Sequence, residues 1–177
     1  MKEYFKELAL TRQSCRDFND VPLKRETIEE IASIAMLAPS ACNSQPWKMY
    51  IVTEPEKLKA VATSLQDHGH NAFTSKAKAF IVISEKDATL KETVSSRFSS
   101  NHFVKYDIGE LTAYITLGAE SLGVKSCIIG WINHDLLKQA INLPDGEISN
   151  IVVALGYSDT PIRDKKRKDA KDTVTLL

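Results

Sequence analysis

The hydrophobic positions of this chain follow two periods, and each period predicts a different kind of element. Between residues 26 and 37 apolar side chains recur three and four positions apart, which predicts an amphipathic helix. Its expected buried positions are Ile28, Ile31, Ala32 and Ala35. Similar signals predict further helices over residues 3–10, 55–66, 107–122 and 134–141. Asp107 and Asn133 are the candidate N-caps of the last two helices.

Short continuous apolar runs predict four strands, over residues 47–52, 79–84, 125–132 and 150–157. Because these runs are nearly continuous, both faces of each strand are expected to be covered by other elements. Residues 11–18 are predicted to be extended, and residues 85–105, which lack a clear period, are expected to form a mobile excursion. The alternation of helices and strands indicates an α+β or α/β sandwich.

Composition narrows the class of protein without identifying a function. The chain has 177 residues, 43% hydrophobic and 26% charged, which is ordinary for one globular domain. Its formal net charge of zero gives no reason to expect a nucleic-acid or membrane partner. The first twenty residues lack the apolar core of a secretory signal, and the three cysteines are too few and too widely spaced for a disulfide framework. These features together predict a cytoplasmic protein.

Two N-terminal stretches carry candidate chemistry. In an extended "RQSCR" segment, residues two apart point the same way, so Arg12, Ser14 and Arg16 would present two guanidinium groups and a hydroxyl together. That set matches a phosphate, although solvated arginines paired with nearby carboxylates are the alternative. The loop "APSACNSQPW", residues 38–47, holds two prolines and two amides, more than a turn requires. It could present hydrogen-bonding groups to a ligand, or its polar residues could simply cap turns.

Two later features, a glycine and a basic tail, each allow both a functional and a purely structural interpretation. Gly130 ends the apolar run "CIIGW", where a glycine allows close approach of a ligand or marks a bulge. The tail stretch "PIRDKKRKDAKD" is rich in Lys and Arg, and could capture a phosphate, contact nucleic acid or be merely solvated. The chain has no G-x-G-x-x-G, P-loop, G-x-S-x-G or H-E-x-x-H motif, and no metal site is predicted.

Taken in order, "RQSCRDF", "APSACNSQPW", "CIIGW", "ALGY" and the basic tail resemble the nitroreductase family of FMN-dependent oxidoreductases, over almost the whole chain. The resemblance implies an α+β fold with a central, mostly antiparallel sheet flanked by helices, and a homodimer with FMN at its interface. It also implies hydride transfer from NADH or NADPH through flavin N5 to a small-molecule electron acceptor, such as a nitroaromatic or a quinone, by a ping-pong route. The flavin carries the chemistry, so no catalytic side chain is predicted.

The resemblance also assigns cofactor-binding positions. They are Arg12, Gln13, Ser14, Arg16, Pro39, Ser40, Ala41, Asn43, Gln45, Asn71, Ile129, Gly130, Lys165 and Arg167. Arg12 and Ser14 would meet the phosphate and ribityl end, and Arg16 the pyrimidine edge. The backbone N–H of Gly130 would face N5, and the loop residues would come from the other subunit. In the tail, a shift of one residue would replace the basic pair by Lys166 or Lys168.

The implied organisation is a single FMN-binding domain over residues 1–160 and a basic C-terminal arm over residues 161–177. The arm would cross to the partner subunit, where its end, "TVTLL", could add a strand. Thr74 stands where some family members carry a lysine, so the tuning of the flavin's redox potential can differ from theirs.

The alternatives to this function are a flavin-binding or flavin-sequestering protein without efficient turnover, a relative with other flavin chemistry such as dehalogenation, and a small nucleic-acid-binding domain.

Overall fold

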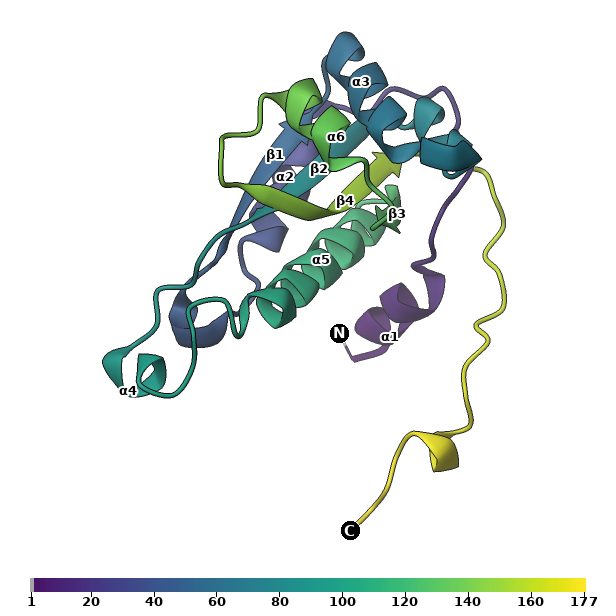
Figure 1. Cartoon of the computed structure of the whole chain (residues 1–177). Coiled ribbons are helices and arrows are strands. Elements are labelled where there is room, and N and C mark those ends of the chain that lie inside the picture. Colours follow the sequence, from purple (N-terminus) through teal and green to yellow (C-terminus); the bar gives the residue numbers. More distant parts are fainter. Residues whose placement is uncertain (1) are drawn as a thin grey trace.

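The computed structural model describes residues 2–177 and places four strands in one sheet. The strands are β1 (Trp47–Val52), β2 (Ala79–Glu85), β3 (Lys125–Ile129) and β4 (Ile148–Gly156). Their order across the sheet is β1-β2-β4-β3, and every neighbouring pair is antiparallel. The expectation of a central antiparallel sheet is therefore confirmed (Figure 1).

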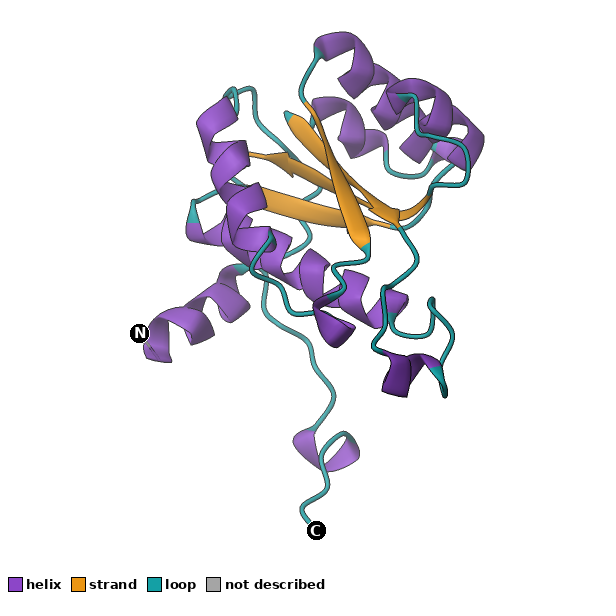
Figure 2. Ribbon diagram, turned by 90° about the vertical axis from the view of Figure 1, so that its left-hand side faces the viewer, coloured by secondary structure: helices purple, strands orange, loops and turns teal. Residues whose placement is uncertain are grey.

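Helices cover both faces of this sheet (Figure 2). On one face α2 (Arg25–Ala35) packs with the long α5 (Val104–Ser121), and on the other α3 (Pro55–Leu65) packs with α6 (His134–Ile141). Strand β2 supplies Ile81 and Ile83 to the first core cluster and Phe80 and Val82 to the second. The apolar runs are continuous because alternate side chains enter two separate cores, as the sequence predicts.

The two edge strands of the sheet, β3 and β1, differ in whether another segment of the chain pairs with them. The outer edge of β3 is covered by the N-terminal segment, in which Ser14 forms a parallel bridge with Ser126 and the Cys15 N–H donates to the Ser126 carbonyl at 2.9 Å. Among residues 2–177, no strand pairs with the outer edge of β1. Backbone groups on that edge are consequently free to pair with another chain.

Two segments extend away from the body (Figure 1). Residues 86–103 form an excursion that includes the short helix α4 (Glu92–Ser95), and the chain after Gly156 runs outward with a single 3-10 turn, Ala170–Asp172. The N-terminal helix α1 (Lys2–Thr11) contacts α5. No helix within residues 2–177 combines the length and the apolar character needed to span a membrane.

Helix α5 begins earlier than the sequence predicts. Its first residue is Val104, so Asp107 lies inside the first turn instead of at the N-cap. The Asp107 carboxylate is buried and accepts a hydrogen bond from the Ala41 N–H at 3.1 Å. Asn133 is the N-cap of α6, as predicted, and accepts from the Leu136 N–H. Strand β3 stops three residues short of its predicted end, and the Asn133 N–H instead bonds to the Ser64 carbonyl.

Gly156, at the end of β4, is required by the packing of the N-terminal segment. A Cβ at this position would lie 2.8 Å from Cδ1 of Phe18, whose side chain is buried in the second core cluster.

We expect Gly156→Ala to lower the free energy of unfolding by about 1–3 kcal/mol, because the Phe18 ring cannot move without disturbing the core. Urea denaturation measures this. Gly109→Ala is the control, since nothing lies within 4 Å of its Cβ position, and a loss of stability no larger than in that control would contradict the prediction.

Candidate cofactor site

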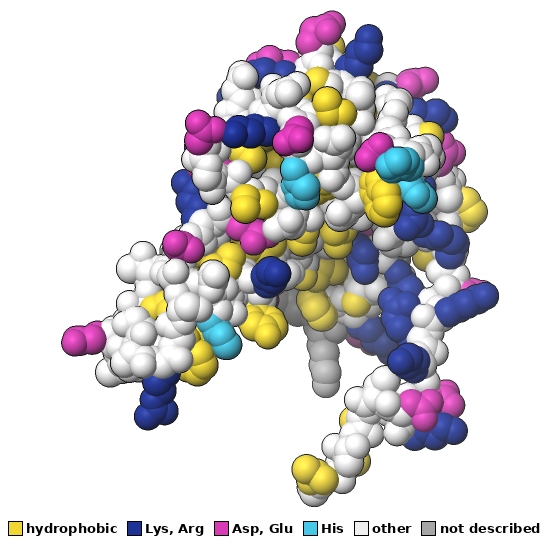
Figure 3. Space-filling model, viewed as in Figure 1, with side chains coloured by type: hydrophobic (Ala, Val, Ile, Leu, Met, Phe, Trp, Pro, Cys, Tyr) yellow, Lys and Arg dark blue, Asp and Glu magenta, His cyan; other side chains and the backbone are white. Residues whose placement is uncertain are grey.

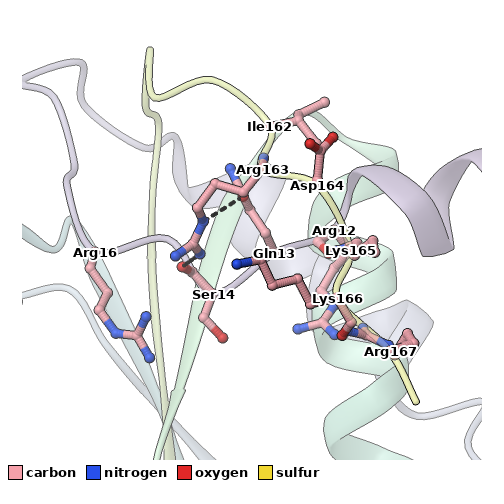
Figure 4. Close-up of a pocket in the computed structure, with 10 residues that line it drawn as sticks. All are labelled: Arg12, Gln13, Ser14, Arg16, Ile162, Arg163, Asp164, Lys165, Lys166 and Arg167. Atoms are coloured by element: carbon pink, nitrogen blue, oxygen red, sulfur yellow. Dashed lines mark hydrogen bonds between the residues drawn. The ribbon is translucent and has the colours of Figure 1, made fainter. Parts of the chain in front are cut away.

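The N-terminal motif and the basic tail form one open groove, although they lie some 150 residues apart in the chain. The groove has a volume of about 780 Å³, within the range of small-molecule sites. Its lining residues are Arg12, Gln13, Ser14, Arg16, Ile162, Arg163, Asp164, Lys165, Lys166 and Arg167. Arg16 stands at one side, and Arg12 lies with the tail cations at the other (Figure 4). The structure therefore brings together the predicted positions of the N-terminal motif with Lys165 and Arg167.

Pairing with β3 explains how the N-terminal motif presents its side chains. The segment runs parallel to the edge of β3, so successive residues face opposite ways. Gln13 and Cys15 are buried, whereas Ser14 is half-buried and Arg16 is exposed. Arg12, Ser14 and Arg16 all line the groove, and the buried Gln13 lines it as well.

The tail is attached to this segment by side-chain hydrogen bonds. The Gln13 Nε2 donates to the Pro161 carbonyl at 3.0 Å, and its Oε1 accepts from both N and Nε of Arg163 at 3.1 Å. The Arg163 Nη2 donates to the Ser14 carbonyl at 2.7 Å, and the Lys165 Nζ donates to the Arg12 carbonyl. Residues 161–165 are consequently held against the same chain that supplies the N-terminal motif.

The groove has an excess of positive charge, and Lys and Arg side chains gather on the side of the body from which the tail extends (Figure 3). Its cations are Arg12, Arg16, Arg163, Lys165, Lys166 and Arg167, and its one carboxylate is Asp164. Among residues 2–177, none of these cations forms an ion pair within 4.0 Å. Burial lowers the pKa of Lys165, and the charges of Arg12 and Arg167 lower it further. An anion in the groove would relieve this repulsion, and guanidinium groups are suited to bind a phosphate.

The loop of residues 38–47 is held rigidly but lies outside the groove. Cys42, Asn43 and Gln45 all have positive φ, between 49° and 55°, which is strained for residues other than glycine. The Gln45 N–H donates to Ser40 Oγ at 2.9 Å, and Asp107 holds the Ala41 N–H. Strain that the surroundings maintain in this way is typical of functional loops. None of Pro39, Ser40, Ala41, Asn43 and Gln45 lines the groove of the same chain.

The other predicted positions also lie outside the groove. Ile129 is buried in the second core cluster, and Gly130 follows the end of β3. A Cβ on Gly130 would meet only the Asn150 carbonyl, at 3.8 Å, so packing within the chain does not require glycine there. Asn71 adopts positive φ, and its Nδ2 donates to the Leu65 carbonyl at 3.0 Å.

Three groove residues were not assigned to the site from the sequence: Ile162, Arg163 and Asp164. Arg163 matters most, because it fixes the tail through Gln13 and Ser14. The available signal was its place in the basic stretch. That stretch contains so many cations that the sequence could not show which one holds the tail and which ones face the groove.

Comparison with known proteins supports the assignment of the fold and the family. Residues 9–157 match the family model described as "Nitroreductase family", so the tail cations lie outside the matched region. A protein of Archaeoglobus fulgidus named "Putative NADH dehydrogenase/NAD(P)H nitroreductase" is 32% identical over 161 residues, which cover 89% of this chain and 86% of that protein. The oxygen-insensitive NADPH nitroreductase of Helicobacter pylori is 26% identical, with 99% and 98% of the two chains covered.

A solved structure gives the same result for the fold. The structure of an FMN-dependent nitroreductase from Clostridium difficile superposes with a TM-score of 0.76 at 24% identity, and covers 99% of this chain and 98% of its own. The antiparallel sheet, the flanking helices and the match over residues 9–157 lead to one conclusion. This chain belongs to the nitroreductase family.

Proposed function

We propose that the protein is an FMN-dependent NAD(P)H oxidoreductase that reduces nitroaromatics, quinones or related small acceptors. The observation that carries the proposal is the groove of cations without carboxylate partners, formed by Arg12, Arg16 and the basic tail. A ligand with a phosphate at one end would neutralise these charges. Membership of the nitroreductase family and the printed names of the relatives support FMN as that ligand and NAD(P)H as the hydride donor.

In this proposal each group of residues has a separate task. Arg12, Lys165, Lys166 and Arg167 bind the phosphate, since they lie together at one side of the groove (Figure 4). Arg16, at the other side, stabilises negative charge on the pyrimidine edge of the ring. When bound, FMN supplies the capacity to accept and pass on a hydride. The protein contributes placement of that cofactor and electrostatic stabilisation of its reduced, negatively charged form.

We also propose that a second copy of the chain completes the site. The strained loop lies outside the groove of its own chain, so its polar groups could reach a flavin only in a partner subunit. An apolar surface suited to such an interface lies along α5 and β3 and includes Ala113, Leu117 and Ile128. The end of the tail exposes Val174 and Leu176, and the outer edge of β1 is unpaired among residues 2–177. Crossing of the tail end to that edge would cover both.

The first test is a flavin titration followed by turnover. We expect the purified protein to carry visible flavin absorbance or to take up added FMN, because the groove offers charge-assisted hydrogen bonds to its phosphate. Oxidation of NADH and NADPH is then measured with menadione, a nitrofuran or an iodinated tyrosine as acceptor. Uptake of FMN without turnover on any acceptor would favour a flavin-sequestering protein, and turnover on the iodinated tyrosine alone would favour dehalogenation. A colourless protein that ignores added FMN would refute the proposal.

Truncation of the tail separates its two expected roles. Removing residues 169–177 keeps Gln13, Arg163 and Lys165 in contact, but removes the exposed end that would cross to the partner. We expect this truncation to weaken the dimer by about tenfold or more, a change of roughly 1.4 kcal/mol. Removing residues 163–177 should also abolish tight FMN binding. Light scattering over a concentration series and FMN titration measure the two effects. A shorter truncation as dimeric as the full chain would exclude the crossing arm.

A further inference from the structure

We propose that Gln13 is a positioning residue, which fastens the C-terminal tail so that the groove discriminates FMN from flavins that lack a phosphate. This inference rests on the proposed function and concerns the same site. The resemblance had implied that Gln13 contacts the cofactor itself. In the structure its side chain is buried, at 8% exposure, and its amide is engaged by the tail. Gln13 would therefore act on the ligand through the residues that it holds.

A side-chain amide meets both demands of this position. The Pro161 carbonyl needs a donor, which Nε2 provides at 3.0 Å. The backbone N–H and the Nε of Arg163 need an acceptor, which Oε1 provides to both at 3.1 Å. A carboxylate could accept both hydrogen bonds but could not donate to Pro161, and an apolar side chain could do neither. The donor and acceptor ends of Gln13 thus match two successive parts of the tail.

Apart from Gln13, few contacts hold the tail in place. The Arg163 Nη2 donates to the Ser14 carbonyl, and the Lys165 Nζ donates to the Arg12 carbonyl. Upstream, the Asn19 side chain donates to Asp159, and the Asn19 N–H to the Tyr157 carbonyl. Beyond these contacts the tail forms no strand and only one short turn. Its cations repel one another and repel Arg12: burial lowers the pKa of Lys165, and the charges of Arg12 and Arg167 lower it further. Without the Gln13 amide, only the hydrogen bonds of Arg163 and Lys165 to the carbonyls of Ser14 and Arg12 would oppose this repulsion, so the tail would be held less firmly.

The same contacts divide the cations into two kinds. The Arg163 guanidinium donates to the Ser14 carbonyl and to Gln13, so it serves to hold the tail. Within residues 2–177, the Arg12 and Arg16 guanidinium groups donate to no protein acceptor, and they remain available for a ligand. By fixing Arg163, Gln13 places the following residues, Lys165 to Arg167, beside Arg12 (Figure 4). Gln13 thereby controls the phosphate end of the groove, and the end near Arg16 does not depend on it.

The decisive variant is Gln13→Leu, which replaces the amide by an apolar side chain of similar size and removes the three hydrogen bonds. We expect the Kd for FMN to rise about tenfold or more, since charged groups lose their placement. The Kd for riboflavin, which has no phosphate, should change less than about twofold, because ring contacts are preserved. Gln139→Leu, on the exposed face of α6, is the matched control. An unchanged ratio of the two Kd values, or equal weakening of both ligands, would overturn the proposal.

A second measurement needs no flavin. In the flavin-free protein, limited trypsin digestion should cleave the tail after Lys165 to Lys168 faster in Gln13→Leu than in the wild type or the Gln139→Leu control. This result tests the attachment of the tail even if the protein proves not to bind FMN. Equal cleavage rates in all three proteins would show that Gln13 does not hold the tail, whatever flavin it binds.

A third variant protects the test against a folding defect. Arg163→Met removes the guanidinium that donates to Gln13 and to the Ser14 carbonyl, and it leaves the backbone partners of Gln13 in place. Arg163 is exposed, so the change does not disturb the domain core. It should raise the FMN Kd while sparing riboflavin, as Gln13→Leu does. In the double variant the loss should be clearly smaller than the sum of the two single losses, because both changes remove the hydrogen bond from the Arg163 Nε to the Gln13 Oε1. Additive losses would mean that the two residues act independently, and would contradict the proposal.

Discussion

The parallel pairing of the N-terminal segment with the edge of β3 is the interaction on which the candidate site depends. A single bridge, between Ser14 and Ser126, and the hydrogen bond from Cys15 to Ser126 fix the register of this segment. The pairing fixes which side chains face outward toward the groove, such as Arg16, and which face the core, such as Cys15. A shift by one residue would exchange the two sets and bury guanidinium groups in an apolar core. The core cluster that contains Phe18 and Cys15 therefore keeps the N-terminal segment in register, and so keeps its arginines at the groove, as well as stabilising the sheet.

A groove lined mainly by cations has an electrostatic cost before any ligand binds. Each added lysine or arginine raises the local potential, and the chain supplies almost no carboxylates to offset it. Backbone carbonyls take over part of this role, since Arg163 and Lys165 donate to the carbonyls of Ser14 and Arg12. The carbonyl oxygens are neutral acceptors, so they orient the cations without removing the positive charge that an anionic ligand would meet. The groove is consequently ordered and electropositive at the same time.

Much of the fold could be predicted from the sequence because its signals are local. The apolar runs of β2 and β4 reflect burial on both faces, and Asn133 caps α6 through a bond to a residue three positions away. The start of α5 could not be predicted in this way. Asp107 has the side chain of an N-cap, but it is used by the Ala41 N–H, 66 residues away. The pairing of Gln13 with the tail spans about 150 residues and leaves no periodic trace, so the N-terminal motif could be recognised while its means of assembly could not.

The great separation of the two segments that form the groove also has a consequence in time. A polypeptide emerging from the ribosome contains the N-terminal motif before any strand of the sheet, and its sheet partner β3 only after β1 and β2. The tail cations arrive only after all four strands have been made. Closing so long a loop requires the intervening sheet to be in place, because that sheet brings the two ends near each other. Under the proposed function, synthesis of the tail would thus determine when the groove can first retain a ligand with a phosphate.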